Sequence, residues 1–298
     1  MKKTIFTGCA TALITPFTQD GKNVDIKGFE ELLEFQKENH ADAFVVAGTT
    51  GESPVLTANE KQSLFSAAVN FANGKIPVIA GTGSNNTEEA VRKSNAAEKE
   101  GVDGLLIVTP YYNKCTQEGI VKHYTYIADR VSTPIIVYDV PSRTGVSVAP
   151  ETYKALAEHK NISAIKEADP DMSKFLKTVE LCGSSLDYYS GNDDLAPSMI
   201  NAGAKGVISV ASNIIPDRIH EMCKYLSEGE NEKGYGIFYS VLRLMNLLFC
   251  EVNPIPVKFA YSLLSGGAVS DAVRLPLTEL LEKNKEKIIA ELTKLNLI

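Results

Sequence analysis

Eight short runs rich in valine and isoleucine recur along the chain, and amphipathic helical stretches separate them. The runs cover residues 8–15, 43–47, 77–80, 104–108, 134–138, 162–166, 186–190 and 206–210. Runs of this kind predict buried strands, and the intervening helices make neighbouring strands parallel, because a parallel neighbour is reached only by a crossover connection. Eight such units in roughly 225 residues predict an α/β fold of the (β/α)8 type, a TIM barrel.

Local signals support the helices between these runs. Thr57 and Glu60 have the spacing of a capping box, which predicts a helix that continues to about Asn73. A doubly wound parallel sheet is the rival architecture. It is less favoured because the chain has no G-x-G-x-x-G fingerprint, and the closest segment, Gly81-Thr-Gly83, lacks the third glycine.

The pattern changes near Gly229, after which no strand-like run follows. Helical patterns cover residues 232–250, 256–265 and 277–295. No low-complexity linker precedes them. We therefore predict a catalytic barrel in residues 1–228 and a C-terminal helical subdomain, packed on the barrel, in residues 229–298.

Composition narrows the class of protein. A net charge of -7 and a pI near 5.3 argue against a nucleic-acid or anionic-membrane surface, because such surfaces need clustered lysine and arginine. The apolar N-terminus is predicted to be a first strand rather than a signal peptide, and no run reaches the roughly 18 apolar residues of a membrane span. Five scattered cysteines predict reduced thiols in a cytoplasmic protein, and the four histidines show no metal-ligand spacing.

Lys166 closes the sixth apolar run, directly before Glu167. Catalytic groups of a barrel lie at the carboxyl ends of its strands, so we expect the Lys166 amine at the mouth of a pocket. Burial favours a neutral, nucleophilic amine over an ammonium, which indicates imine formation with a carbonyl substrate. The alternative is a strand-end lysine that extends to solvent.

Polar residues after the neighbouring strands are expected on the same rim. Tyr138 is the expected proton relay, with Thr50 as its hydrogen-bond partner. Thr49 and Thr50 lie in a glycine-flanked turn whose N–H groups suit a carboxylate, and the planar guanidinium of Arg143 suits a second one. Core packing, an ordinary turn and a surface ion pair are the respective alternatives. The loops after the last two strands lack basic residues, which favours a non-phosphorylated oxo acid.

Four motifs lie at or after the ends of predicted strands: Gly48-Thr-Thr-Gly-Glu-Ser53, Thr109-Pro-Tyr-Tyr112, Tyr138-Asp-Val-Pro-Ser-Arg-Thr-Gly145 and Ile165-Lys166. With them the chain, from Gly8 through the helical tail, resembles the dihydrodipicolinate synthase family. This family belongs to the pyruvate-dependent lysine-Schiff-base aldolase (N-acetylneuraminate lyase) superfamily of (β/α)8 barrels. The resemblance implies a lyase that condenses pyruvate with L-aspartate-4-semialdehyde to 4-hydroxy-tetrahydrodipicolinate, the entry step of the diaminopimelate and lysine pathway, without cofactor or metal.

The resemblance also implies catalytic roles for individual residues. Lys166 would form the imine with pyruvate. Thr50, Tyr138 and Tyr112 would form a proton relay, in which Tyr112 comes from the adjacent subunit of a tight dimer. Two tight dimers would make a homotetramer.

Substrate-binding residues are implied in the same way. Thr49 and Thr50 would hold the carboxylate of pyruvate, while Gly191 and Ile208 would line the pocket near the lysine. Arg143 would receive the carboxylate of the semialdehyde at the entrance.

Feedback inhibition by lysine, through a crevice at the tight-dimer interface, is common in this family. The residues that match the crevice are Ser53, Asn85, Glu89 and Tyr111. Pro54, Ala58 and Lys61 depart from the sensitive bacterial pattern, which has histidines at the last two places. A fixed ammonium at Lys61 repels the charge of the effector, so we expect weak or absent inhibition.

Two alternative functions stay open. N-acetylneuraminate lyases and keto-deoxy-sugar acid aldolases share Lys166, Tyr138 and the glycine-threonine turn, and some sugar-acid aldolases also resemble the synthase around Arg143. A catalytically idle paralogue that binds an oxo acid or an amino acid is the other hypothesis. The complete relay argues against it, because a pure binder needs no proton transfer.

Overall fold

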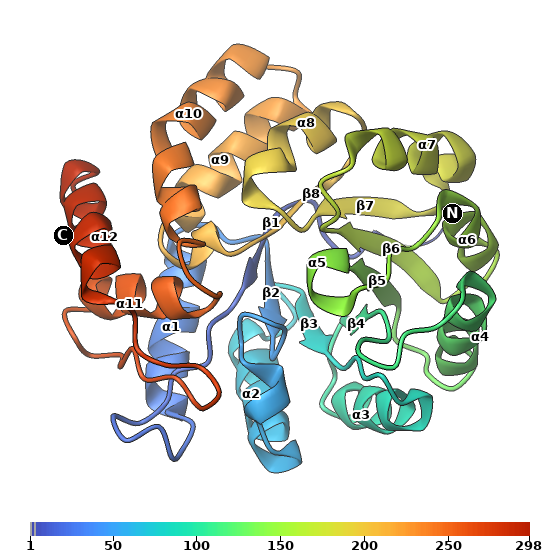
Figure 1. Ribbon diagram of the computed structural model, residues 1–298, viewed down its shortest axis with the longest axis horizontal. Coiled ribbons are helices and arrows are strands. Elements are labelled where there is room, and N and C mark those ends of the chain that lie inside the picture. The colour runs from blue at the N-terminus through green and yellow to red at the C-terminus, as the bar shows by residue number, and fades with distance from the viewer. Residues whose placement is uncertain (1, 3) are drawn as a thin grey trace.

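A computed structural model describes residue 2 and residues 4–298, and its centre is a closed barrel of eight parallel strands (Figure 1). The strands pair in chain order, and β1 also pairs with β8. They are β1 (Gly8–Ala12), β2 (Ala43–Val46), β3 (Val78–Gly81), β4 (Gly104–Val108), β5 (Ile135–Asp139), β6 (Ile162–Glu167), β7 (Asp187–Ser190) and β8 (Gly206–Ser209). The predicted (β/α)8 barrel is confirmed, and a doubly wound sheet is excluded because this sheet has no edge.

Helices form the outer layer of the barrel (Figure 1). The α-helices are α1 (Ile26–Glu38), α2 (Ala58–Ala72), α3 (Thr87–Lys99), α4 (Gln117–Ala128), α5 (Pro141–Thr144), α6 (Pro150–Ala157), α7 (Met172–Cys182), α8 (Ala196–Asn201), α9 (Pro216–Ser227), α10 (Asn231–Leu247), α11 (Ile255–Leu264) and α12 (Glu282–Lys294). Single 3-10 turns are η1 (Ser53–Val55), η2 (Gly183–Ser185), η3 (Asp193–Leu195) and η4 (Ala211–Asn213).

Helix α2 begins and ends where the sequence predicts. The Thr57 hydroxyl accepts the Glu60 N–H at 3.2 Å, and the Glu60 carboxylate accepts the Thr57 N–H at 2.8 Å, which completes the capping box. Asn73 ends the helix in the left-handed conformation, with φ of 45°. These bonds satisfy backbone groups that a helix end otherwise leaves unpaired.

Three predicted element ends are wrong by three residues or more. Helix α10 ends at Leu247 rather than at residue 250, because the N–H groups of Phe249 and Cys250 donate three residues back instead of four. Strand β1 ends at Ala12 rather than at residue 15, because the N–H of Ile14 donates to the side chain of Asn213 at 3.1 Å instead of to a neighbouring strand. The last helix begins at Glu282 rather than at residue 277. Its start is delayed because the N–H of Leu281 donates to a side-chain carboxylate, that of Glu251, at 3.0 Å.

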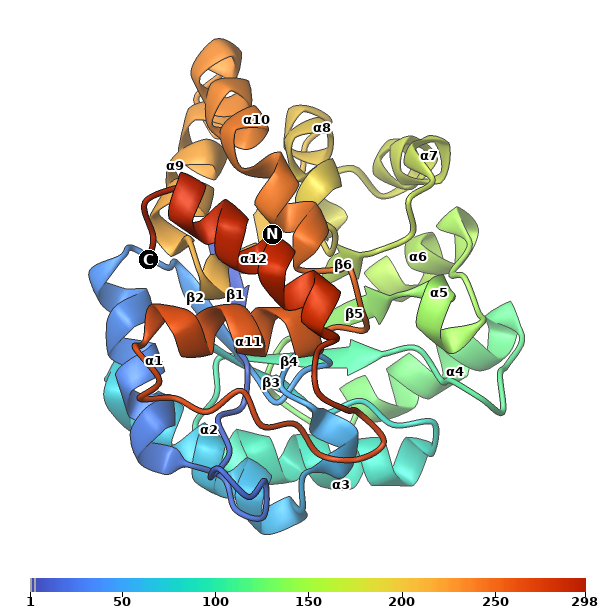
Figure 2. The ribbon, with the colours of Figure 1, turned by 60° about the vertical axis from the view of Figure 1, so that its left-hand side comes forward.

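The C-terminal helices α10, α11 and α12 follow the last helix of the barrel. Figure 2 shows α11 and α12 side by side, and α10 contacts both α9 and α12. A division at residue 228 between a barrel and a helical subdomain stays a prediction. Within residues 2 and 4–298, no helix is both long and apolar enough to cross a membrane.

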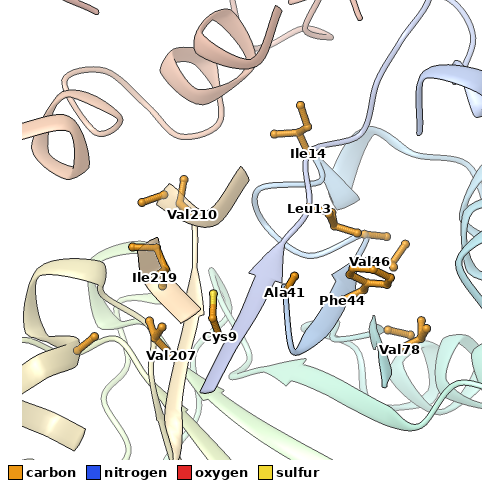
Figure 3. Packing of buried hydrophobic residues seen from close by; sticks show 14 of the residues in the cluster. Cys9, Leu13, Ile14, Ala41, Phe44, Val46, Val78, Val207, Val210 and Ile219 are labelled. Atoms are coloured by element: carbon orange, nitrogen blue, oxygen red, sulfur yellow. The ribbon is translucent and has the colours of Figure 1, made fainter. Parts of the chain in front are cut away.

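Two hydrophobic layers hold the barrel together. One fills its interior, and the other lies between the strands and the outer helices. Figure 3 shows part of the outer layer, with Cys9 of β1, Val207 of β8 and Ile219 of α9. Fully burying an aliphatic side chain contributes about 1.5–3 kcal/mol. Because successive side chains of a strand point to opposite layers, neighbouring residues at a strand end face different surroundings.

Candidate active site

Lys166 and Tyr138 lie side by side inside the barrel, at the carboxyl ends of the adjacent strands β6 and β5. The strand register pairs the two residues directly. The Lys166 Nζ lies 4.3 Å from the centre of the Tyr138 ring, and the two residues are 6% and 7% exposed. The lysine is therefore buried beside a phenol rather than extended into solvent.

A cavity of about 210 Å³ surrounds this pair. Most of the predicted site residues line it, namely Thr49, Thr50, Tyr138, Arg143, Lys166 and Gly191. A Cβ atom on Gly191 would lie 3.2 Å from the Lys166 Cε and 2.8 Å from the Cβ of Ala168, so a side chain at position 191 would crowd the lysine. Ile208 is fully buried in the interior layer of the barrel and does not line the cavity.

Thr50 is positioned by Asn253, a residue that the sequence did not point to. The Asn253 side chain donates to the Thr50 hydroxyl oxygen at 3.0 Å, and both residues are buried. The predicted hydrogen bond between Thr50 and Tyr138 is not formed among the residues that the structure describes. Because its oxygen accepts from Asn253, the Thr50 hydroxyl keeps its hydrogen for another acceptor. No local motif marks Asn253, which lies 203 residues further along the chain.

The turn that carries Thr49 and Thr50 is anchored to helix α11 by a buried ion pair. Glu52 ends this turn in the left-handed conformation, with φ of 53°. Its buried carboxylate lies 2.7 Å from the Nζ of Lys258, which is also buried and donates to the carbonyl of Thr15 at 2.9 Å. Burial lowers the pKa of Lys258 to about 8, and Glu52 opposes this shift. The turn is thereby fixed to α11.

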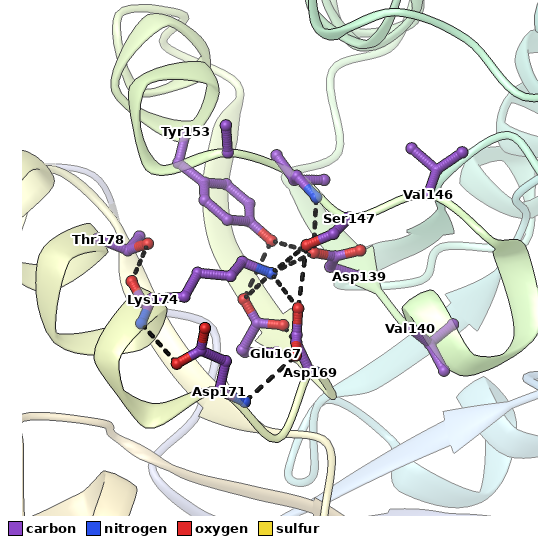
Figure 4. A network of polar contacts seen from close by, with 12 residues as sticks. Asp139, Val140, Val146, Ser147, Tyr153, Glu167, Asp169, Asp171, Lys174 and Thr178 are labelled. Atoms are coloured by element: carbon purple, nitrogen blue, oxygen red, sulfur yellow. Dashed lines mark hydrogen bonds and ion pairs between the residues drawn. The ribbon is translucent and has the colours of Figure 1, made fainter.

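A polar cluster lies on the opposite face of the two strands that carry Lys166 and Tyr138 (Figure 4). Asp139 and Glu167 follow these residues directly, so they point outward, towards α6 and α7. Their carboxylates share the ammonium of Lys174, at 2.7 Å and 3.2 Å. The cluster ties the ends of β5 and β6 to helix α7.

Asp169 and Tyr153 complete this cluster. Asp169 lies 3.0 Å from the Lys174 Nζ, and the Tyr153 hydroxyl lies 3.3 Å from carboxylate oxygens of both Asp139 and Glu167. Burial, with the nearby Asp139 charge, raises the pKa of Glu167 to about 8. Oxygens of the three carboxylates lie within 4.8 Å of one another, a spacing that also suits a metal ion. Here the Lys174 ammonium provides the compensating positive charge.

Tyr112 is not part of the cavity within one chain. Its side chain is 91% exposed, and its backbone has a φ of 67°. The predicted crevice residues Ser53, Glu89 and Tyr111 line one cavity of about 520 Å³ between α2 and α3. Asn85 does not line that cavity, and its carbonyl accepts from the Asn113 side chain at 3.1 Å.

A buried lysine beside a tyrosine, at the carboxyl ends of adjacent strands of a (β/α)8 barrel, is the arrangement that the Schiff-base aldolase class uses. Within this class, the model of the dihydrodipicolinate synthetase family matches residues 5–295. The chain belongs to that family.

Individual relatives agree with this membership. A 4-hydroxy-tetrahydrodipicolinate synthase of Alkaliphilus oremlandii is 46% identical over 99% of this chain and 100% of its own length. The crystal structure of a dihydrodipicolinate synthase from Thermotoga maritima superposes with a TM-score of 0.96, at 43% identity, over 99% of this chain and 100% of that one. A synthase from Acinetobacter baumannii complexed with pyruvate gives a TM-score of 0.96 at 39% identity, over the same shares of the two chains.

Proposed function

We propose that this chain condenses pyruvate with L-aspartate-4-semialdehyde to give 4-hydroxy-tetrahydrodipicolinate, the entry step of diaminopimelate and lysine biosynthesis. Full-length membership in the dihydrodipicolinate synthetase family supports this reaction. The observation that carries it is the single cavity that holds Lys166, Tyr138, Thr50 and Arg143. It combines an amine for one carbonyl substrate with a guanidinium at the entrance for a second, anionic one.

The first half-reaction joins pyruvate to the enzyme. The Lys166 amine attacks the C2 carbonyl of pyruvate, and the resulting carbinolamine loses water to give a protonated imine. Tyr138, whose ring centre lies 4.3 Å from the amine, carries the hydroxyl that moves protons between these intermediates. The turn at Thr49 and Thr50 holds the carboxylate of pyruvate.

The second half-reaction forms the carbon–carbon bond. Loss of a C3 proton converts the imine to an enamine, whose C3 attacks the aldehyde carbon of the second substrate. The amino group of that substrate then displaces Lys166 by transimination, which closes the ring and frees the lysine. The protonated imine is the electron sink, so the proposed reaction needs no cofactor or metal.

Substrate comparison tests this assignment against its sister activities. We expect condensation with aspartate-4-semialdehyde to be much faster than cleavage of N-acetylneuraminate or of keto-deoxy-gluconate, because Arg143 presents a cation rather than polyol-binding groups at the entrance. Faster cleavage of either sugar acid would reassign the chain to an aldolase of that substrate. Pyruvate binding without any turnover would indicate an idle paralogue.

Substitution Arg143→Ala should damage use of the aldehyde and spare the imine. A charge-assisted bond to a carboxylate is worth about 1.5–3 kcal/mol, so we expect kcat/KM for the semialdehyde to fall about 10- to 100-fold. Borohydride trapping of pyruvate should match that of the unchanged protein. Arg130→Ala, which removes an exposed guanidinium on α4's C-terminal side, is the matched control. Loss of trapping in Arg143→Ala would place the arginine in the pyruvate subsite instead.

Lysine should inhibit this enzyme weakly or not at all. Lys61 lines the same cavity as Ser53, Glu89 and Tyr111, and its ammonium opposes a cationic effector. Steady-state rates with increasing lysine measure this, and a submillimolar inhibition constant would contradict it. The double substitution Ala58→His/Lys61→His, which introduces the residues of the sensitive pattern, should increase the inhibition.

We also propose a cytoplasmic homotetramer, made of two tight dimers, in which Tyr112 completes the site of the neighbouring subunit. Its exposed ring supports this role. Sedimentation should give four times the chain mass of 32.3 kDa. When inactive Lys166→Ala and Tyr112→Phe subunits are mixed and re-associated, we expect about a quarter of the unchanged activity, because half of the dimers then contain one intact site. No recovery would exclude the shared site.

A further inference from the structure

A single ammonium group lies behind the two catalytic side chains, on the outer face of β5 and β6 (Figure 4). It belongs to Lys174 of α7, whose Nζ lies 2.7 Å from an oxygen of Asp139 and 3.2 Å from one of Glu167. Asp169 and Ser147 contribute two more oxygens, at 3.0 Å and 2.9 Å. In the described part of the chain, no other cation pairs with Asp139 or Glu167. Because the ammonium itself lies among the carboxylates, the cluster is an ion-pair site rather than a metal site.

Each of the two buried carboxylates belongs to the residue that follows a catalytic one. Asp139 follows Tyr138, and Glu167 follows Lys166. The strand register pairs the two catalytic residues with each other and the two carboxylate residues with each other. Successive side chains of a strand point to opposite faces, so the carboxylate pair lies directly behind the catalytic pair. A change in the separation of the carboxylates therefore also changes the separation of Lys166 and Tyr138.

Backbone hydrogen bonds link the same two residues to the wall of the catalytic cavity. The carbonyl oxygen of Asp139 accepts the N–H of Ala168 at 2.9 Å. That of Glu167 accepts the N–H of Gly191 at 2.6 Å. Ala168 and Gly191 both line the cavity. The position of the carboxylates therefore affects the cavity wall as well as the amine.

Without the ammonium, the two carboxylates would repel each other. Asp139 is fully buried and Glu167 is only 2% exposed, so water screens their charges poorly. Breaking a buried ion pair by removing one partner is costly, because it leaves an uncompensated charge. Removal of Lys174 would leave like charges between the ends of β5 and β6.

We propose that Lys174 is a positioning residue for imine formation, because its ammonium keeps together the two strand ends that carry Lys166 and Tyr138. Lys174 does not line the catalytic cavity, so it acts through the strands rather than on the substrate. The inference rests on the proposed function, in which Lys166 is the amine and Tyr138 moves protons. It adds a requirement from outside the barrel, which the proposed reaction by itself does not contain.

The effect of losing Lys174 should depend on pH, because Glu167 can take up a proton. The other titratable and charged groups around the two carboxylates are Tyr124 of α4, Tyr153 of α6, Asp169 after β6 and Lys174 of α7. Burial, with the nearby carboxylate charge, raises the pKa of both tyrosines well above its usual value, so both stay neutral. Burial lowers and the two carboxylates raise the pKa of Lys174, with a net increase, so its ammonium persists at alkaline pH.

Glu167 decides the direction of this pH dependence. Burial, with the nearby Asp139 charge, raises the pKa of Glu167 to about 8, and Lys174 opposes the shift. When Lys174 is replaced, a proton on Glu167 still prevents repulsion at neutral pH. The proton is lost above about pH 8, and the repulsion then separates the strand ends.

Trapping of the pyruvate imine by cyanoborohydride, read by mass spectrometry, tests this role on the assembled protein. We expect Lys174→Met to trap pyruvate about 10- to 100-fold more slowly than the unchanged protein at about pH 10, with a smaller loss towards about pH 7. Lys174→Arg should keep most of the rate, because it keeps the cation. Lys177→Met, which removes an exposed lysine of the same helix, is the matched control. An unchanged rate in Lys174→Met, or a loss that is the same at every pH, would overturn the proposal.

A neutral triple variant separates the charges of the cluster from its shape, and it remains a test if Lys174→Met does not fold. Lys174→Met/Asp139→Asn/Glu167→Gln leaves no buried charge at the two strand ends. It should fold, and at about pH 10 it should trap pyruvate at least about fivefold faster than Lys174→Met. A triple variant that does not fold, or that folds and traps no faster, would overturn the proposal. An unchanged protein that traps no pyruvate would instead contradict the proposed function, and with it the basis of this inference.

Discussion

Substitution Lys166→Ala is expected to abolish turnover. Without the amine no imine forms, and loss of a covalent nucleophile lowers kcat by at least about ten-thousand-fold. Borohydride with pyruvate should add one reduced pyruvyl group to the Lys166 peptide of the unchanged protein and none to the variant. Mass spectrometry of the digested protein reads both results directly.

The matched control for this prediction is Lys205→Ala. Lys205 is an exposed lysine that directly precedes β8, at the opposite end of the barrel. Its removal should leave both trapping and turnover unchanged. Substantial turnover in Lys166→Ala, or an unmodified Lys166 peptide after trapping, would show that this amine is not the nucleophile.

Substitution Lys258→Met is expected to destabilise the protein more than other single changes at ion pairs. It leaves the Glu52 carboxylate buried without its cation, and breaking a buried pair in this way costs about 3–5 kcal/mol. At a fixed protein concentration, the midpoint of thermal unfolding should fall by roughly 5 to 15 °C. Because Glu52 ends the turn of Thr49 and Thr50, turnover should fall as well.

Two further variants separate the buried pair from a general loss of charge. The double substitution Glu52→Gln/Lys258→Met removes both charges, so it should be more stable than Lys258→Met alone. Lys122→Met removes a cation from an exposed pair with Glu118 and should change stability by less than about 1 kcal/mol. If Lys258→Met and Lys122→Met unfold at the same temperature, the buried pair does not stabilise the turn.

Most of the barrel could be predicted because its signals are local. Alternation of apolar runs with amphipathic helices identifies eight strands, and the capping box at Thr57 sets the start of α2. Two of the errors lie where a side chain accepts a backbone N–H, that of Asn213 after β1 and that of Glu251 before α12. Such a contact depends on which segments the fold brings together, so no local pattern contains it.

The candidate site divides in the same way. Lys166, Tyr138, Thr50 and Arg143 could be predicted because each lies at or after the carboxyl end of a strand, and these ends of a parallel barrel meet at one rim. Asn253 and Lys258 could not, because they act on the turn of Thr50 and Glu52 from more than 200 residues away. Asp139 and Glu167 directly follow Tyr138 and Lys166 in the sequence. Their shared cation could not be predicted, because Lys174 lies on a separate helix.

The sequence by itself determined the type of barrel and the chemical groups at its rim, since hydrophobic periodicity and residue type are properties of short segments. The tertiary structure alone decided how those groups are positioned and which buried lysines lie beside a carboxylate. Lys174 and Lys258 each neutralise buried carboxylates, whereas Lys61 faces a cavity without an ionic partner among the described residues. The three lysines are alike as residues and differ because burial and distance to a carboxylate arise only when the chain folds.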